Sequence, residues 1–152
     1  YEISLGLVGS EMCIRDSVGC DDAEDEQYED FQALEKQLQK LFTYEGYPYR
    51  LLKLPMPDAI YDEGDRLTTD KNSKGDRLPA TYANYLVMNN VVLYPTYAQP
   101  DNDEAAAEVL HKAFPGRDVV GVDCRALIRQ HGSLHCVTMQ YPKGVLPQTF
   151  SD

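Results

Sequence analysis

Residues 91–122 read VVLYPTYAQPDNDEAAAEVLHKAFPGRDVVGV and contain the pattern of a strand, a helix and a second strand. Residues 91–94 are strand-like, and the segment 101–103, with Asp101 and Asp103, marks a helix start, because negative charge is favourable at a helix N-terminus. Apolar residues then recur at helical spacing: Ala106, Val109, Leu110, Ala113 and Phe114. Pro115 and Gly116 end the helix, and residues 119–122 form the next strand.

The same order occurs earlier, over residues 18–54. Residues 18–22 have the pattern of a strand end that leads into an acidic helix start, since seven of the ten residues 21–30 are acidic. One predicted helix face follows: Tyr28, Phe31, Leu34, Leu38, Leu41 and Phe42. Gly46 and Pro48 end that helix, and a strand is expected at 49–54. The repeat predicts an α/β fold in which neither unit buries its faces alone.

The segment between the two units contains a hairpin and a polar loop. Residues 82–88 and 91–94 are strand-like, and the pair Asn89-Asn90 between them tolerates positive φ, so a hairpin is expected. Residues 60–80 are mostly polar and contain GDRL twice, at 64–67 and 75–78. We interpret this duplication as a tolerated loop insertion.

Residues 130–140 read QHGSLHCVTMQ and place a cysteine directly after a glycine-containing loop. Residues 134–139 have the composition of a short strand, which would put Leu134, Cys136 and Thr138 on one face and His135 on the other. His135 is then badly placed to act as a base for Cys136. Cys136 is the candidate nucleophile, although a cysteine in a strand is more often a small buried hydrophobic residue.

Three stretches together resemble the agmatine deiminases of the peptidyl-arginine deiminase, or pentein, superfamily. They are LPATYANYL at 78–86, VVGVDCRALI at 119–128 and GSLHCVTMQ at 132–140. The resemblance runs from about residue 18 to about residue 142. It implies a partial pentein, an α/β propeller, of which the chain holds roughly the last two of five units plus the nucleophile strand. The resembling family usually has glycine at the position of His131. This difference affects the expected shape of the loop and not the identity of the nucleophile.

The resemblance implies a reaction as well as a fold. Cys136 would attack the guanidinium carbon of agmatine, and water would then release N-carbamoylputrescine for putrescine synthesis. The other residues expected in or near the site are Asn84, His131, Gly132 and Ser133. No cofactor and no metal are expected. The family's His-x-Asp pair for proton transfer does not occur in these 152 residues, so we expect a C-terminal fragment that is inactive by itself.

Composition restricts the classes of partner. The net charge of −11 argues against nucleic acid and favours a small cationic substrate. Four cysteines without C-x-x-C spacing argue against zinc and suit reduced thiols in a cytoplasmic protein. No apolar run approaches the roughly 20 residues that cross a bilayer, so no membrane partner is expected. A homo-oligomer is left open.

Residues 1–17 differ from the rest of the chain. Residues 4–17, SLGLVGSEMCIRDS, fit no periodic pattern and resemble translated sequencing-adapter sequence. We expect 1–17 to be a non-native segment outside the fold and 18–152 to be the C-terminal part of a guanidine-hydrolase domain. The alternative is a genuine N-terminal strand with a glycine-rich turn.

Two other functional interpretations stay open. One is a peptidyl-arginine deiminase of the same superfamily, which differs at the far end of the substrate. The other is a non-catalytic binding module that kept a pentein-like fold. This module would be favoured if the gene itself lacked the acid–base pair.

Overall fold

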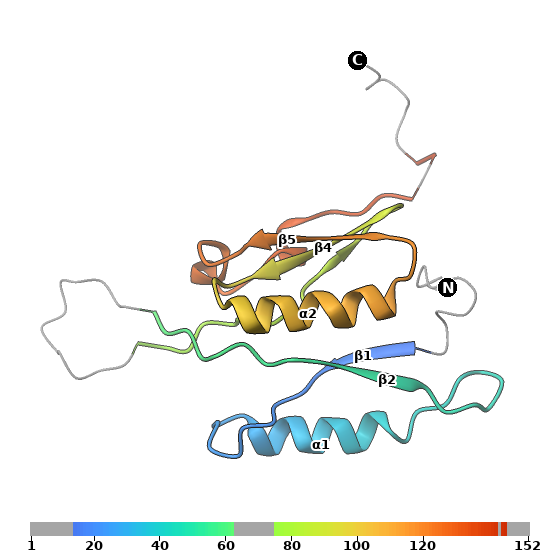
Figure 1. Cartoon of the computed structure of the whole chain (residues 1–152), viewed down its shortest axis with the longest axis horizontal. Coiled ribbons are helices and arrows are strands. Elements are labelled where there is room, and N and C mark those ends of the chain that lie inside the picture. Colours follow the sequence, from blue (N-terminus) through green and yellow to red (C-terminus); the bar gives the residue numbers. More distant parts are fainter. Residues whose placement is uncertain (1–13, 63–74, 143, 146–152) are drawn as a thin grey trace, which may run out of the picture.

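The computed structural model describes residues 14–62, 75–142 and 144–145. In Figure 1 the elements are stacked as α1, a two-stranded sheet, α2 and a three-stranded sheet. The helices are α1 Tyr28–Leu38 and α2 Pro100–Ala113, with short 3-10 helices η2 Leu127–Gln130 and η3 His135–Val137. The strands are β1 Ile14–Val18, β2 Arg50–Leu54, β3 Leu86–Val87, β4 Val91–Thr96 and β5 Asp118–Asp123.

Both predicted strand–helix–strand units are confirmed. β1 pairs in parallel with β2, and α1 connects them. β4 pairs in parallel with β5, from Val91 opposite Asp118 to Thr96 opposite Asp123, and α2 connects them. Parallel strands need such a crossover because a tight turn cannot reverse the chain twice. The described part of the chain is thus a small mixed α/β structure.

The predicted hairpin is present, but its first strand is short. β3 and β4 are antiparallel, with Leu86 opposite Leu93, and the Met88 N–H donates to the Val91 carbonyl at 2.8 Å. Residues 82–85 do not continue β3 as predicted. The Thr81 side-chain oxygen accepts the Ala83 N–H at 3.2 Å, a local bond that competes with strand pairing.

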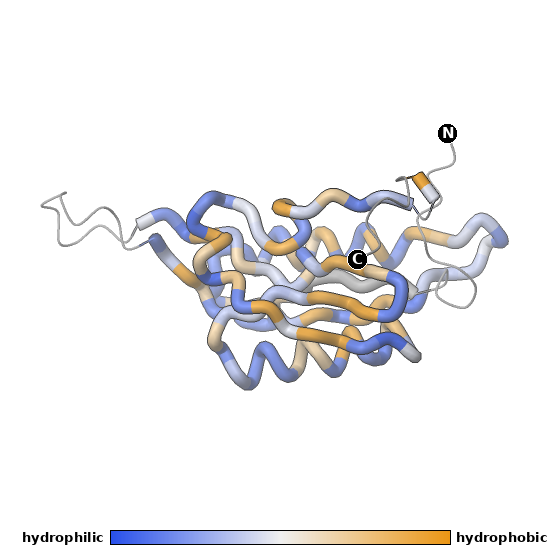
Figure 2. The backbone as a smooth tube through the Cα atoms, turned by 90° about the horizontal axis from the view of Figure 1, so that it is seen from above, coloured by the Kyte–Doolittle hydropathy of each residue, from blue (hydrophilic) through white to orange (hydrophobic). Residues whose placement is uncertain are grey.

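The core lies around α2, between the two sheets (Figure 1). Ala106, Leu110 and Ala113 are its buried residues, as the helical spacing predicts. Figure 2 shows mostly hydrophobic strands in the middle of the molecule and mostly hydrophilic loops at its ends. The helix begins after Gln99 with Pro100 in its first turn, so Asp101 is not the cap. Neither described helix is long and apolar enough to cross a membrane.

We expect Leu110→Ala to destabilise the fold by about 2–5 kcal/mol, because it leaves a cavity in a core that cannot close around it. Leu110 is 0% exposed, whereas Leu34 of α1 is 41% exposed. Leu34→Ala is therefore the matched control and should cost much less. Urea unfolding followed by circular dichroism measures both variants. Equal losses would contradict the assignment of the core to α2.

The first helix is confirmed, but its apolar face is only partly covered. α1 has no buried residue, and it forms the outer layer of the stack in Figure 1. Leu41 and Phe42, predicted on the helix face, lie beyond its end and are 49% and 59% exposed. The expected buried face is therefore wrong for the described part of the chain. A two-stranded sheet offers α1 too little surface to bury it.

The expectation that residues 1–17 lie outside the fold does not hold for residues 14–17. These four residues and Val18 form β1, in which Ile14 lies opposite Arg50 and Val18 opposite Leu54. A strand edge pairs through backbone groups, so an extended neighbour can bind it whatever its side chains are. Residues 1–13 lie outside the described residues. The foreign origin of the segment stays a prediction.

The second GDRL copy lies in irregular structure, as expected for a loop, but its end is anchored to the fold. Leu78 is buried, and Arg77 donates two hydrogen bonds of 2.9 Å to the Asp25 carboxylate. The guanidinium of Arg77 holds the pKa of Asp25 below its ordinary value. The first copy lies outside the described residues.

Candidate active site

Cys136 lies in the 3-10 turn η3, so the predicted strand over residues 134–139 is wrong. Leu134 has helical angles of φ −53° and ψ −55°, and Thr138 is the first extended residue after the turn. The Thr138 N–H and hydroxyl both donate to the His135 carbonyl, at 3.0 and 2.8 Å, and close the turn. Leu134 is consequently buried while Cys136 is exposed, although the strand pattern put them on one face.

The loop before the turn brings its backbone close to the thiol. His131 has a left-handed φ of 62°, a conformation that glycine, the residue expected here from the resemblance, adopts without strain. Histidine is among the residues that adopt this conformation more readily than most. A Cβ on Gly132 would lie 3.2 Å from the Cys136 Cβ, so a larger residue there would push the cysteine by a few tenths of an ångström.

Asn84 lies directly beside the candidate nucleophile. Its Nδ2 donates to the Cys136 Sγ at 3.2 Å, and its Oδ1 accepts the His135 N–H at 2.7 Å. The second bond fixes the orientation of the amide, because only the oxygen can accept a backbone N–H. Asn84 therefore joins the turn after Thr81 to the loop that carries Cys136.

Backbone and amide N–H donors face the sulfur of Cys136. The Ser133 backbone N–H and then the Asn84 amide lower the pKa of the Cys136 thiol from its ordinary value. Hydrogen bonds to the charged form of a group favour that form. The site thus stabilises a thiolate, which is the nucleophilic form of cysteine.

The other described cysteines have different surroundings. Cys20 and Cys124 are buried, and burial raises the pKa of the Cys124 thiol. No cluster of three or more metal-ligating side chains occurs within residues 14–62, 75–142 and 144–145. Over the same residues, the side-chain hydrogen bond to the Cys136 sulfur comes from the Asn84 amide and not from His131 or His135.

Sequence reasoning missed Tyr97, whose hydroxyl lies beneath the site. Ser133, predicted as a site-loop residue, is 2% exposed, and its Oγ is 3.1 Å from the Tyr97 hydroxyl. Tyr97 follows the apolar strand β4 and has the pattern of an ordinary core residue. The two hydroxyls meet only in the folded structure, because Tyr97 and Ser133 are 36 residues apart in sequence.

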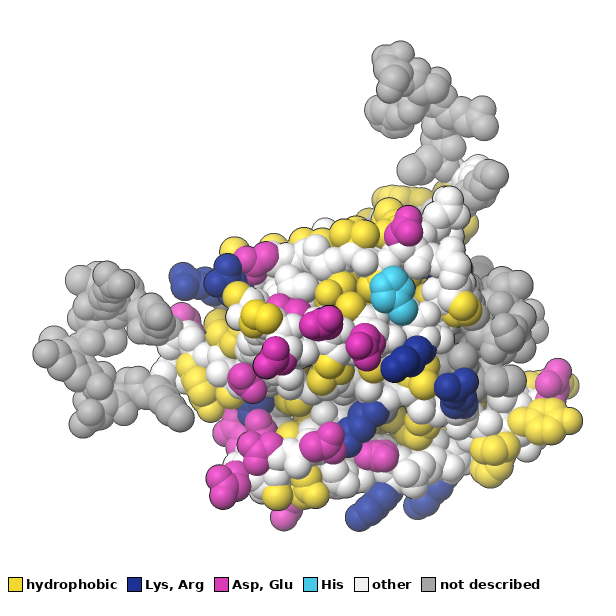
Figure 3. Space-filling model, viewed as in Figure 1, with side chains coloured by type: hydrophobic (Ala, Val, Ile, Leu, Met, Phe, Trp, Pro, Cys, Tyr) yellow, Lys and Arg dark blue, Asp and Glu magenta, His cyan; other side chains and the backbone are white. Residues whose placement is uncertain are grey.

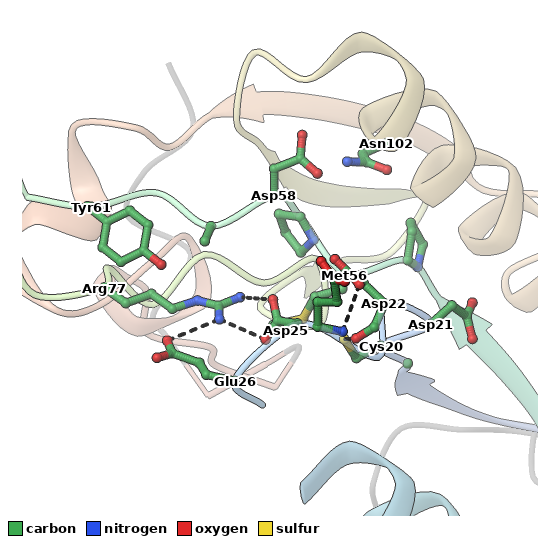
Figure 4. A pocket seen from close by; sticks show the side chains of 15 residues that line it. Cys20, Asp21, Asp22, Asp25, Glu26, Met56, Asp58, Tyr61, Arg77 and Asn102 are labelled. Carbon is green, nitrogen blue, oxygen red and sulfur yellow. Dashed lines mark hydrogen bonds and ion pairs between the residues drawn. The ribbon is translucent and has the colours of Figure 1, made fainter. Parts of the chain in front are cut away.

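A pocket of about 750 Å³ lies away from Cys136, beyond the ends of β1 and β2. Figure 4 shows the guanidinium of Arg77 held there between Asp25 and Glu26. Figure 3 shows acidic side chains gathered over the first halves of α1 and α2. Acidic side chains are favourable near helix N-termini, so these positions explain much of the chain's negative charge without a ligand.

The described fold has counterparts in known proteins. The model of the Porphyromonas-type peptidyl-arginine deiminase family matches residues 9–142. The chain belongs to this family. The match begins nine residues before residue 18, where the resemblance was expected to start. It therefore includes the described strand β1.

Relatives and solved structures carry deiminase names. A Marinomonas sp. protein named "Putative agmatine deiminase" is 37% identical over 130 residues, which are 82% of this chain and 35% of that protein. The Campylobacter structure titled "C. Jejuni Agmatine Deiminase" is 37% identical with a TM-score of 0.68, over 82% of this chain and 33% of that one.

A structure titled as a "Putative Arginine Deiminase" from Porphyromonas gingivalis is 47% identical to this chain, with a TM-score of 0.77. The match covers 88% of this chain and 36% of that one. These neighbours have the pentein fold, so the predicted fold family is confirmed at that level. The chain spans about 35% of the length of the curated relatives it matches.

Proposed function

We propose that this chain is the C-terminal part of a guanidine hydrolase in which Cys136 is the nucleophile. The observation that carries the proposal is an exposed thiol that accepts hydrogen bonds from Asn84 and from the Ser133 backbone. Membership of a deiminase family gives the class of reaction. Asn84, Gly132 and Ser133 are proposed to hold the sulfur, and His131 to shape the loop.

The reaction replaces one C–N bond of a guanidinium by a C–O bond. The Cys136 thiolate forms a bond to the guanidinium carbon, a proton is delivered to one nitrogen, and ammonia leaves. Water then adds to the S-linked amidino carbon, and the thiolate leaves as the ureido product forms. A covalent adduct divides a difficult hydrolysis into two easier steps. The protons are moved by groups of the remaining part of the protein.

Agmatine is the proposed substrate, and N-carbamoylputrescine for putrescine synthesis is the proposed product. The agmatine deiminase names of the relatives support this choice, and the net charge of −11 suits a cationic substrate. A peptidyl-arginine substrate is the second candidate, because the matching family model carries that name. A binding module without catalysis is the third and requires that the whole protein lack an acid–base pair.

The architecture and setting of the whole protein are part of the same proposal. The chain would supply roughly the last two of five pentein units together with the segment that bears Cys136. This division agrees with a chain that covers 33% to 37% of the solved deiminases. We propose a cytoplasmic enzyme that needs no metal or cofactor, because a thiol and a proton-transfer pair suffice for the chemistry.

A haloacetamidine probe tests the identity of the nucleophile. In a restored protein, residues 18–152 joined to the N-terminal part of a family member, the probe should label Cys136, because its amidinium mimics the guanidinium. Peptide mapping by mass spectrometry locates the label. Cys124→Ser is the matched control and should label as the parent does. A label on Cys124 with Cys136 unmodified would show that the nucleophile was assigned wrongly.

A further inference from the structure

Two separate segments of the chain build the thiol site. Residues 81–84 form the turn that carries Asn84, and residues 131–136 form the loop that carries Cys136. The first segment provides the Asn84 amide as a donor to the sulfur, and the second provides the Ser133 backbone N–H. The surroundings of the sulfur therefore depend on how these two segments are held against each other.

The Tyr97 hydroxyl contacts both segments. It accepts the Thr81 N–H at 3.0 Å and donates to the Thr81 carbonyl at 3.0 Å. It also lies 3.1 Å from the Ser133 Oγ. A tyrosine hydroxyl has one proton, so when Tyr97 donates to Thr81 the Ser133 hydroxyl must donate to Tyr97.

Tyr97 is itself held firmly. It is 2% exposed, and its backbone N–H donates to the Asp103 Oδ1 at 3.1 Å. Its ring packs against the Tyr82 ring with 5.5 Å between the centroids. The Tyr82 hydroxyl donates to the same Asp103 oxygen at 2.6 Å. The hydroxyl of Tyr97 therefore occupies a fixed point below the site.

We propose that Tyr97 is a positioning residue that sets the reactivity of Cys136 through Ser133. The inference rests on the proposed role of Cys136 and goes beyond it, because Tyr97 touches neither the sulfur nor a substrate. Without the hydroxyl, the Thr81 N–H and the buried Ser133 side chain would each lose a hydrogen bond. Buried donors rarely stay unsatisfied, so the loop and the turn would shift to find other partners.

Alkylation of Cys136 by iodoacetamide tests the inference on the whole 152-residue chain. A Cys13→Ser background leaves Cys136 as the exposed cysteine, since Cys20 and Cys124 are buried. The rate at Cys136 is measured by peptide mapping over a range of pH in the parent, in Tyr97→Phe and in Ser133→Ala. Both variants should move the profile to higher pH and slow the reaction near pH 7 by about 3- to 10-fold, because less thiolate is present.

The double variant separates positioning from independent packing effects. If Tyr97 acts through Ser133, Tyr97→Phe combined with Ser133→Ala should shift the profile no further than the larger single change. Additive shifts would overturn the inference. So would a parent-like profile in Tyr97→Phe whose circular dichroism shows a folded chain. If Tyr97→Phe does not fold, Ser133→Ala decides: a parent-like profile there overturns the inference and a shifted one supports it.

Tyr94→Phe is the matched control. Tyr94 is also buried, but its hydroxyl donates to the Asp103 carbonyl at 3.2 Å and contacts neither segment of the site. Its alkylation profile should match that of the parent, and an equal shift would instead show general loosening of the core. Alkylation needs no substrate, so it tests the role of Tyr97 separately from the proposed role of Cys136 as nucleophile. If Cys136 were not the nucleophile, the haloacetamidine probe would label Cys124 in the restored protein.

Discussion

The 152-residue chain alone is expected to form no measurable N-carbamoylputrescine from agmatine. Residues 18–152 joined to the N-terminal part of a family member should turn the substrate over, and Cys136→Ala should abolish that activity. In the chain alone the thiol has hydrogen-bond donors, but no described imidazole contacts the sulfur and the sequence contains no His-x-Asp pair. General acid–base catalysis contributes about 10²–10⁴ in rate, which the fragment would lack.

Poor orientation of the substrate should reduce the rate of the chain alone still further. Reacting groups that are held in one frame gain rate through effective molarity, and a substrate bound to one side only lacks that advantage. Both proteins are assayed at equal concentration for the ureido product. Cys124→Ser in the restored protein controls for packing and should retain turnover. Robust turnover by the chain alone, lost on Cys136→Ala, would show that His131 or another residue of this chain supplies the proton transfer.

The repeated strand–helix–strand units could be predicted because their signals are local. The spacing of Ala106, Leu110 and Ala113 reports directly which face of a helix is apolar, and α2 buries that face. Spacing does not report whether a covering surface exists. The pattern of α1 is as clear, yet Leu34 and Leu38 are not buried in the described part of the chain.

The site was harder to predict because its contacts are distant in sequence. The composition of residues 134–139 favours a strand, but the bonds from Thr138 to the His135 carbonyl form a turn that exposes Cys136. Asn84 is 52 residues from Cys136, and Tyr97 is 36 residues from Ser133. Family motifs drew attention to Asn84 and Cys136 but gave no reason to single out Tyr97.

The second large effect concerns Asn84→Asp, which should slow alkylation of Cys136 near pH 7 by about 10- to 100-fold. The carboxylate can still accept the His135 N–H through one oxygen, as the Asn84 Oδ1 does at 2.7 Å, so the loop keeps this anchor. The second carboxylate oxygen takes the place of the Asn84 Nδ2, so a negative charge faces the sulfur where an N–H donor did. A like charge in contact raises the pKa of a thiol, and less thiolate remains at neutral pH.

Asn84→Ala is the comparison that isolates the charge. It removes the donor and the loop anchor without adding a carboxylate, so its alkylation profile should lie between those of the parent and Asn84→Asp. Added salt should recover part of the rate in Asn84→Asp, because the pair is exposed and screened, and should leave Asn84→Ala nearly unchanged. If Asn84→Asp reacted as fast as Asn84→Ala at every pH, a charge at position 84 would not act on the thiolate. If Asn84→Ala also matched the parent, the 3.2 Å contact between Asn84 and Cys136 would not stabilise the thiolate.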